Sequence, residues 1–155
     1  MKLIVDSREQ KSYVSILERV GVECTVKALK TGDYSIEGLE SSFALERKSL
    51  SDFISSITLG RSRFKRELDR SRELKYFAII IECSYYDIKN KNYYSNIDPK
   101  CVLNTIFSFS VKYNVPVFLV ESREGGALAV LRLSQFYLKY YQNKEDVDKN
   151  EWLSK

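Results

Sequence analysis

Short apolar runs alternate along the chain with longer segments in which apolar residues recur at helical spacing. The apolar runs and the alternating segments predict strands over residues 2–5, 22–29, 34–36, 43–45, 76–82 and 115–120. The helical spacing predicts helices over residues 11–20, 50–59, 61–75, 99–113 and 122–141. Because strands and helices alternate in order, we expect an α/β fold with a central mixed β-sheet flanked by helices on both faces.

Local signals mark several of these boundaries. Ser49 is a good N-cap, with Asp52 at the third helical position, so a helix should begin soon after Lys48. The nearly unbroken apolar run over residues 76–82 predicts a central strand that is covered on both faces. Residues 85–96 are polar and tyrosine-rich without a readable period, so we expect a loop there, although its tyrosines could stack on unpaired bases.

The length of 155 residues fits one domain, which is long enough to bury roughly two-thirds of its unfolded surface. We assign residues 1–142 to this domain and expect residues 143–155 to form a charged, flexible tail. The chain has no apolar run approaching the ~18 residues of a membrane span, and its three cysteines are far apart. We therefore expect reduced thiols in an intracellular protein, from the cytoplasm of a prokaryote or virus-infected cell, or from a nucleus.

The chain contains no histidine. This excludes Ser-His-Asp and Cys-His nucleophile systems, zinc sites that use histidine, and the most common general base. A catalytic site in this chain would have to use carboxylates, lysine, arginine, tyrosine and a bound metal ion.

Two acids and a lysine form the first candidate site. Side chains on a strand alternate between faces, so Glu46 and Lys48 should point the same way and Arg47 the other way. An acid beside a lysine, with Asp33 one strand away, suits a metal-dependent phosphodiesterase, because carboxylate oxygens hold hard divalent cations. In the plainer interpretation Asp33 is a turn residue, and Glu46 and Lys48 lie on an exposed edge strand. Residue chemistry alone leaves both interpretations open.

The first predicted strand also ends in charged residues. Asp6 would add a further carboxylate if this strand lies near Glu46, with Arg8 and Glu9 supporting the site. In the plainer interpretation Arg8 and Glu9 are first-turn charges of a helix. Asp52 has a plain role too, because it can complete a helix N-cap.

These motifs together resemble a known nuclease domain. The segments Val5–Glu9, Gly32–Tyr34, Glu46–Phe53 and Ser56–Ile57 are similar to the nuclease domain of the XPF family of structure-specific endonucleases, including the archaeal Hef nuclease. The resemblance extends over residues 3–141 in the family's order. It implies a restriction-endonuclease-like fold and a Mg²⁺-dependent cut in DNA near a branch during repair or replication, with Mn²⁺ able to replace Mg²⁺.

The resemblance also implies roles for single residues. Asp33 and Glu46 match the family's metal ligands, and Lys48 matches its catalytic lysine. The other matching active-site positions are Asp6, Glu9, Arg47 and Asp52. We expect Arg47 and Asp52 to be catalytic and Asp6 to reach the metal through water. No matched position is missing, which favours an active nuclease; the alternatives are a non-catalytic DNA-binding subunit and a four-way-junction or restriction-type nuclease of the same fold.

The predicted helix over residues 61–75 is strongly basic. It carries seven Lys and Arg residues against three acids, an excess equal to the net charge of the whole chain, +4. In a plain interpretation the charges pair four residues apart on a solvated helix. Downstream of a nuclease motif we favour contacts with DNA phosphates by Arg61, Arg63, Lys65 and Arg66.

The last two predicted helices are too apolar for one buried stripe each. The plain interpretation is that they belong to the core. Members of the resembled family dimerise through this region, so we expect a homodimer. Its predicted interface residues are Phe107, Leu131, Phe136, Tyr137 and Tyr140.

Many members of the resembled family also carry a tandem helix-hairpin-helix domain that grips DNA. No Gly-rich hairpin pattern follows residue 141 here. We therefore expect a further DNA-binding or sliding-clamp-type protein to supply this grip, unless the protein is a minimal nuclease or the sequence is part of a longer chain. The preference among flap, fork and junction DNA stays open.

Overall fold

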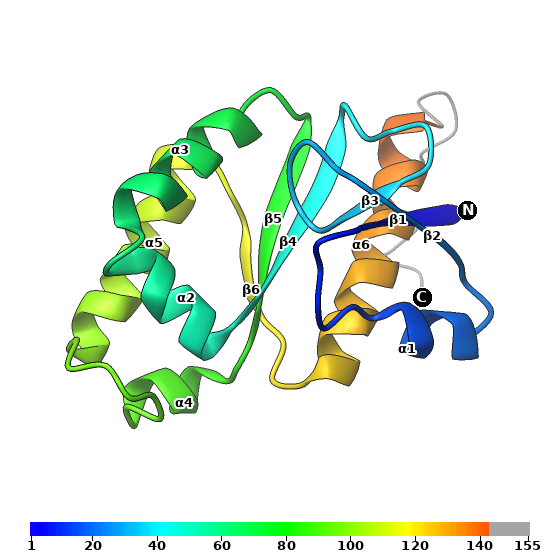
Figure 1. Cartoon of the computed structure of the whole chain (residues 1–155). Coiled ribbons are helices and arrows are strands. Elements are labelled where there is room, and N and C mark those ends of the chain that lie inside the picture. Colours follow the sequence, from blue (N-terminus) through cyan, green and yellow to red (C-terminus); the bar gives the residue numbers. More distant parts are fainter. Residues whose placement is uncertain (143–155) are drawn as a thin grey trace, which may run out of the picture.

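The computed structural model describes residues 1–142, and the predicted elements occur in the expected order, with one further short helix (Figure 1). The predicted tail, residues 143–155, lies outside the described part of the chain. The strands are β1 Lys2–Asp6, β2 Glu23–Lys27, β3 Tyr34–Ile36, β4 Phe43–Ser49, β5 Tyr76–Glu82 and β6 Val117–Leu119. The helices are α1 Val14–Arg19, α2 Leu50–Ile57, α3 Arg61–Ser71, α4 Tyr85–Lys89, α5 Pro99–Tyr113 and α6 Arg123–Gln142. None of the helices in this described part is long and apolar enough to cross a membrane.

The strands form one mixed sheet in the order β2-β1-β3-β4-β5-β6. β1 is parallel to β2 and antiparallel to β3, and β3 is antiparallel to β4. β4, β5 and β6 are parallel, which places Glu46 opposite Ile79 and Ser49 opposite Glu82. The predicted α/β class with a central mixed sheet is confirmed.

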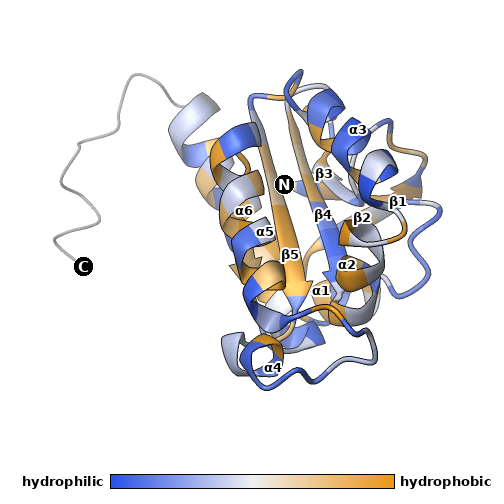
Figure 2. Ribbon diagram, turned by 90° about the vertical axis from the view of Figure 1, so that its left-hand side faces the viewer, coloured by the Kyte–Doolittle hydropathy of each residue, from blue (hydrophilic) through white to orange (hydrophobic). Residues whose placement is uncertain are grey.

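Helices cover both faces of this sheet (Figures 1 and 2). On one face α2, α3 and α5 pack against Ile79 and Ile81 of β5. On the other face α1 and α6 pack against Ala78 and Ile80 of the same strand. The apolar run over residues 76–82 is therefore a central strand covered on both faces, as its composition predicted.

Gly32 fixes the turn that carries Asp33 to the side of β4. Its φ is +80°, and a Cβ at this position would lie 2.9 Å from the Ala44 Cβ, so a side chain here would be strained. The Asp33 N–H donates to the Leu45 carbonyl at 2.8 Å, and the Asp33 carbonyl accepts the Asp6 N–H at 2.8 Å. The turn thus joins the end of β1 to the middle of β4 around Asp33.

β4 ends at Ser49, directly before α2. The Ser49 Oγ accepts the Asp52 N–H at 3.1 Å, which is the N-cap that the sequence predicted. The strand therefore extends through Glu46, Arg47 and Lys48, so that successive side chains leave opposite faces of the sheet.

Residues 85–96 are not a loop throughout, and the sequence prediction is wrong over their first part. Tyr85–Lys89 form α4, in which the N-cap Ser84 accepts the Asp87 N–H and the Asp87 carboxylate accepts the Ser84 N–H. This reciprocal capping box begins the helix. With only five residues, α4 is too short to show a helical period in the sequence.

The apolar residues of α6 are divided between the core and the surface. Tyr137 is only 5% exposed, and the centre of its ring lies 4.7 Å from that of Phe43. Its predicted place in a dimer interface is therefore corrected, because it belongs to the core of the single chain. Leu131 is half-buried at the margin of that core, whereas Phe136 and Tyr140 are exposed.

Candidate active site

A cavity of about 540 Å³ opens between β4, the Asp33 turn and the helices α2 and α3. Its charged lining residues are Arg8, Glu9, Asp33, Glu46, Arg47, Lys48, Asp52, Arg63 and Glu67. The fold therefore gathers in one place all the residues that the sequence predicted to be catalytic.

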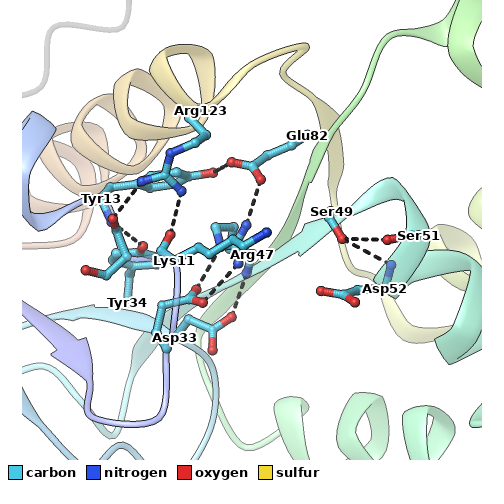
Figure 3. Close-up of polar contacts among 12 residues, drawn as sticks. Lys11, Tyr13, Asp33, Tyr34, Arg47, Ser49, Ser51, Asp52, Glu82 and Arg123 are labelled. Atoms are coloured by element: carbon cyan, nitrogen blue, oxygen red, sulfur yellow. Dashed lines mark hydrogen bonds and ion pairs between the residues drawn. The ribbon is translucent and has the colours of Figure 1, made fainter.

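The Asp33 carboxylate lies beside the backbone of β4. Its Oδ2 accepts the Arg47 N–H at 2.8 Å (Figure 3). Burial, and after it the charge of Glu9, raises the pKa of Asp33 to about 7. Burial and Glu9 outweigh the charges of Lys48 and Arg47, which lower this pKa, and a bound cation would further favour the ionised carboxylate.

Glu46 and Lys48 point to the same side of β4, as the alternation of the strand predicted. Lys48 Nζ lies 3.7 Å from Glu46 Oε1 and 5.0 Å from the centre of the Phe64 ring. The two side chains are largely buried, 18% and 12% exposed. Burial, and after it the charge of Asp33, raises the pKa of Glu46 well above its usual value. Asp33 and Glu46 thus form a pair of buried, mutually repelling carboxylates with Lys48 beside them.

Arg47 points to the opposite side of β4 into a network of carboxylates (Figure 3). Its Nε and Nη2 donate to the two oxygens of Glu9 at 2.9 and 3.0 Å, and its Nη1 donates to Glu82 Oε1 at 2.6 Å. The Arg47 side chain is 6% exposed. These bonds hold the guanidinium among carboxylates, while the Arg47 backbone N–H positions Asp33. The predicted catalytic role of Arg47 stays a prediction.

Glu82 and Tyr13 complete this network, and the sequence singled out neither of them. The Tyr13 hydroxyl donates to Glu82 Oε2 at 2.7 Å, and the Tyr13 N–H donates to Tyr34 Oη at 2.9 Å. Glu82 had a usable signal, because it ends the apolar run over residues 76–82 with a charge. Tyr13 had none, since its carboxylate partner lies 69 positions away in the sequence.

The first turn of α6 holds Tyr13 in place. Arg123 donates to two carbonyl groups in the segment before α1, at 2.7 and 2.9 Å, and its guanidinium lies 5.4 Å from the centre of the Tyr13 ring. Gly126 approaches the same ring so closely that a Cβ would lie 2.0 Å from Tyr13 Oη. A side chain at position 126 would therefore displace the hydroxyl that binds Glu82.

Gly126→Ala is expected to destabilise the protein by about 1–2 kcal/mol, because the overlap with Tyr13 outweighs the better helix propensity of alanine. For a chain of this size, we expect the melting temperature to fall by roughly 5 °C. Differential scanning fluorimetry measures this shift. The control is Gln135→Ala on the exposed side of α6, which should leave the melting temperature nearly unchanged. Equal melting temperatures for the wild type and Gly126→Ala would contradict the close packing.

The Asp6 carboxylate is held by its own neighbours. The Leu29 N–H donates to its Oδ1 at 2.8 Å, and Arg8 Nε donates to its Oδ2 at 3.0 Å. Burial alone would raise the pKa of Asp6, but the hydrogen bonds from Arg8 and Leu29 outweigh burial and lower it. Asp6 lines a second cavity of about 260 Å³ together with Asp33 and Glu46. It thus lies near the carboxylate pair, and its contact with a metal through water stays a prediction.

Two further carboxylates line the main cavity. Asp52 lies in the first turn of α2, where its backbone N–H serves the N-cap and its side chain faces the cavity lining. Glu67 lies on α3, and its charge contributes to the raised pKa of Glu46. The sequence suggested Glu67 only as an ion-pair partner of Arg63, four residues earlier on the same helix face, and not as a residue of the site.

Comparisons with known proteins decide the family of this chain. The ERCC4 domain family matches residues 5–130, which include every residue of the main cavity. The chain belongs to this family. No curated protein matches the chain.

Two similar solved structures place this ERCC4 domain among the XPF-type structure-specific endonucleases. XPF from Aeropyrum pernix matches with a TM-score of 0.73 and 27% identity over 98% of this chain and 70% of that chain. XPF from Aeropyrum pernix in complex with DNA matches with a TM-score of 0.70 and 26% identity, over 97% and 70%. The resemblance to the XPF family and the restriction-endonuclease-like fold that it implied are confirmed.

Asp33 and Glu46 are the residues of this ERCC4 domain that could hold a divalent cation. Among the residues that the structure describes, no group of three or more Cys, Asp or Glu side chains is arranged to hold a metal ion. Asp33 and Glu46 nevertheless suit Mg²⁺, which binds through one or two carboxylates and leaves its other positions to water and substrate phosphates. The raised pKa of both carboxyl groups fits a position that a cation completes.

Of the four basic residues of α3 that the sequence predicted to contact DNA, only Arg63 lines the active-site cavities. Arg63 lines both of them. Arg61 lines neither, because its Nη1 donates to a carbonyl at the end of α2 at 3.2 Å and its guanidinium lies 5.1 Å from the centre of the Phe109 ring. These contacts hold the Arg61 side chain against α2 and α5, and its predicted phosphate contact stays a prediction. Lys65 and Arg66 lie on α3 outside both cavities and stay predicted DNA contacts.

Proposed function

We propose that this protein is a Mg²⁺-dependent endonuclease that cuts branched DNA during repair or replication. The observation that carries the proposal is the meeting of Asp33, Glu46 and Lys48 in one cavity of an ERCC4 domain. DNA as the partner is supported by the similar XPF from Aeropyrum pernix whose structure is a complex with DNA. Mn²⁺ is expected to replace Mg²⁺, because both prefer oxygen ligands.

In this proposal Asp33 and Glu46 hold the ion, which acts as a Lewis acid on the scissile phosphate when bound. Lys48 Nζ lies between Glu46 and the Phe64 ring, where it neutralises the negative charge that develops on the phosphate oxygens. The low exposure of both side chains strengthens this interaction, since water screens it less.

Other residues of the cavity position this set. The Arg47 N–H holds the Asp33 carboxylate, and Asp52 supports the site from the first turn of α2. Arg8 and Arg63 line the same cavity and contact the phosphates beside the scissile one. Such contacts align the DNA backbone without reading its sequence.

The affinity for Mg²⁺ is expected to rise with pH. An acid must lose its proton to bind a metal ion, and the pKa of Asp33 is raised to about 7. Below that pH protons compete for the carboxylate, so affinity should fall by up to about tenfold per pH unit. Isothermal titration calorimetry with MgCl₂ at a series of pH values measures this, and a pH-independent affinity would contradict it.

The variant Asp33→Asn tests the raised pKa of Asp33 through thermal stability, without a metal ion or a cleavage assay. Because folding raises the pKa of Asp33 from 3.8 to about 7, the folded state holds this proton more tightly, and stability falls as pH rises between these values. Asparagine removes this loss, so Asp33→Asn in EDTA should melt at least a few degrees higher than the wild type at pH 8. At pH 4 the difference should nearly vanish. A lower melting temperature for the variant at pH 8 would contradict the raised pKa.

The branched substrate is tested by comparing labelled duplex, single-strand, flap, fork and four-way DNA with Mg²⁺. We expect cuts in a branched form, close to the branch point, and little cutting of plain duplex. Equal cutting of duplex would overturn structure specificity, and binding of every form without cutting would support a non-catalytic subunit. The further DNA-binding or sliding-clamp-type partner stays a prediction. Such a partner would raise the affinity for DNA more than it would change the position of the cut.

We further propose a homodimer through the sheet edge at β6. Exposed apolar residues lie on this edge strand, on α5, which precedes it in the chain, and on α6, which follows it. They are Phe107, Val111, Phe118, Leu128, Phe136 and Tyr140. A second copy would cover both the apolar side chains and the open edge of the strand. This set keeps three of the interface residues that the sequence predicted.

Phe118→Lys is expected to convert the dimer into a monomer, because it places a charge at the centre of this surface. Val26→Lys on the opposite edge strand, β2, is the matched control and should leave the dimer intact. Sedimentation velocity measures both. A monomeric wild type, or a Phe118→Lys variant that stays dimeric, would exclude this interface.

A further inference from the structure

A third cavity, of about 490 Å³, lies at the far end of α3 from the active-site cavity. Its lining residues come from the ends of α3 and α5, the start of β5 and the last turn of α6. Its charged and aromatic lining residues are Arg72, Lys75, Tyr76, Phe77, Lys112, Tyr113 and Tyr141. Nothing in the proposed cleavage site uses these residues.

The charges in this third cavity are all positive. No Asp or Glu lines it, and within residues 1–142 neither Lys75 nor Lys112 forms an ion pair. Arg72 has a structural role, since its Nη2 donates to the Lys112 carbonyl at 3.0 Å at the end of α5. Lys75 has no such bond and lies beyond the end of α3. Arg72 also forms an exposed ion pair with Asp69 at 3.5 Å, and Lys112 Nζ lies 5.3 Å from the centre of the Tyr113 ring. The concave surface thus keeps two lysines without a carboxylate partner, which attract an anionic group.

Aromatic rings lie beside these cations. Tyr141 is 47% exposed, and one face of its ring stacks on the buried Tyr137, with the centres 4.8 Å apart, which holds it in place. Tyr76 is half-buried and stacks on Phe43 at 5.8 Å. Proteins bind unpaired nucleotides with these two features together: cations contact the phosphates, and rigid aromatic rings stack on the bases.

The helix α3 connects this cavity to the active site. Arg63 lines the active-site cavity, and Arg72 lines the third cavity nine positions later, about 14 Å along the helix axis. That distance corresponds to about four nucleotides at 3.4 Å per nucleotide along a stacked strand. Arg66 and Arg70 are exposed on α3 between the two ends. A volume of about 490 Å³ suits one nucleotide and excludes a duplex arm.

We propose that the third cavity binds a nucleotide of an unpaired arm of the DNA, about four nucleotides from the cut. This inference rests on the proposed cleavage of branched DNA and adds a second anchoring point to it. Its consequence is a dependence on arm length, because a short arm ends before it reaches Lys75 and Lys112.

The test compares DNA flaps whose single-stranded arm has about two or about eight nucleotides, with fluorescence anisotropy in EDTA so that no DNA is cut. The wild type is expected to bind the longer arm about tenfold more tightly. The double variant Lys75→Gln/Lys112→Gln should lose this gain and cut saturating DNA at the wild-type rate with Mg²⁺. Its melting temperature shows whether the variant is folded.

The matched control removes the same charge elsewhere. Lys89→Gln/Lys100→Gln lies on α4 and α5 outside all of these cavities, and should weaken binding to both arms equally. Tyr141→Leu keeps the charges and should also reduce the gain from the longer arm.

An equal gain in the wild type and in Lys75→Gln/Lys112→Gln would overturn the third cavity as a nucleotide site. The proposal would also be overturned if lengthening a double-stranded arm increased the affinity as much as lengthening a single-stranded arm. If the wild type binds with this length dependence yet cuts no DNA, the proposed cleavage fails while the nucleotide site stands.

Discussion

Glu46→Gln is expected to reduce the rate of DNA cleavage by about 1000-fold or more. Glutamine keeps the size of the side chain but removes the charge that the divalent ion needs, and a loss of about 4 kcal/mol of transition-state stabilisation corresponds to this factor. DNA binding in EDTA should be nearly unchanged, because glutamine has the size and polarity of a carboxyl group whose raised pKa disfavours the charged form when no metal is bound. Single-turnover cleavage and fluorescence anisotropy measure the two effects separately.

Lys48→Ala should give a similar loss for a different reason. Its Nζ lies 3.7 Å from Glu46 Oε1 in a largely buried position, where removal of a cation leaves the carboxylates and the phosphate without compensation. The controls are Glu18→Gln and Lys89→Ala, which remove exposed charges far from the cavity lining. Cleavage by Glu46→Gln or Lys48→Ala at more than a tenth of the control rates would contradict the assignment.

Arg47→Met is expected to have the largest effect on stability. The change leaves Glu9 and Glu82, whose side chains are 7% and 12% exposed, as buried carboxylates without their cation. Breaking a buried ion network in this way costs about 3–5 kcal/mol, which lowers the melting temperature by roughly 10 °C in a chain of this size. Lysine cannot restore the bidentate contact with Glu9, so Arg47→Lys should recover only part of the loss.

A triple variant separates stability from catalysis at Arg47. Glu9→Gln/Arg47→Met/Glu82→Gln removes the stranded charges, keeps an acceptor for the Tyr13 hydroxyl, and should regain most of the melting temperature. The backbone N–H at position 47 still holds Asp33, so this variant should also regain much of the cleavage rate. A stable triple variant that cuts no DNA would instead assign the guanidinium a direct role in cleavage.

The sequence predicted the parts of the site that depend on local rules. Alternation along β4 placed Glu46 and Lys48 together and Arg47 opposite, and the Ser49 cap fixed where the strand gives way to α2. Asp33 followed from the turn at Gly32 and from the resemblance to the XPF family.

The sequence could not predict contacts that the sheet order creates. Arg47 meets Glu9 and Glu82 across 38 and 35 positions, and the second contact requires knowing that β4 and β5 are parallel neighbours. The resemblance to the XPF family implied a site role for Arg47, but it did not indicate these two carboxylate partners. The contact of the Arg61 guanidinium with Phe109 could not be predicted for a related reason, since helical position alone does not show where a long side chain points.

The apolar content of α6 was ambiguous in a similar way. A helix can be rich in aromatic residues because it lies in the core or because it meets a partner, and α6 does the first with Tyr137 while it exposes Phe136 and Tyr140. Only the packing of Tyr137 against Phe43 separates these cases.

Single-turnover cleavage of a branched DNA across a Mg²⁺ titration, beside Asp33→Asn, tests the central claim most directly. We expect no cutting in EDTA, cutting near the branch that saturates with Mg²⁺, and no cutting by Asp33→Asn at any concentration. Because asparagine should stabilise the fold at pH 8, unfolding would not explain its inactivity. Cutting in EDTA, or cutting by Asp33→Asn at the wild-type rate, would contradict a metal-dependent nuclease built on Asp33 and Glu46.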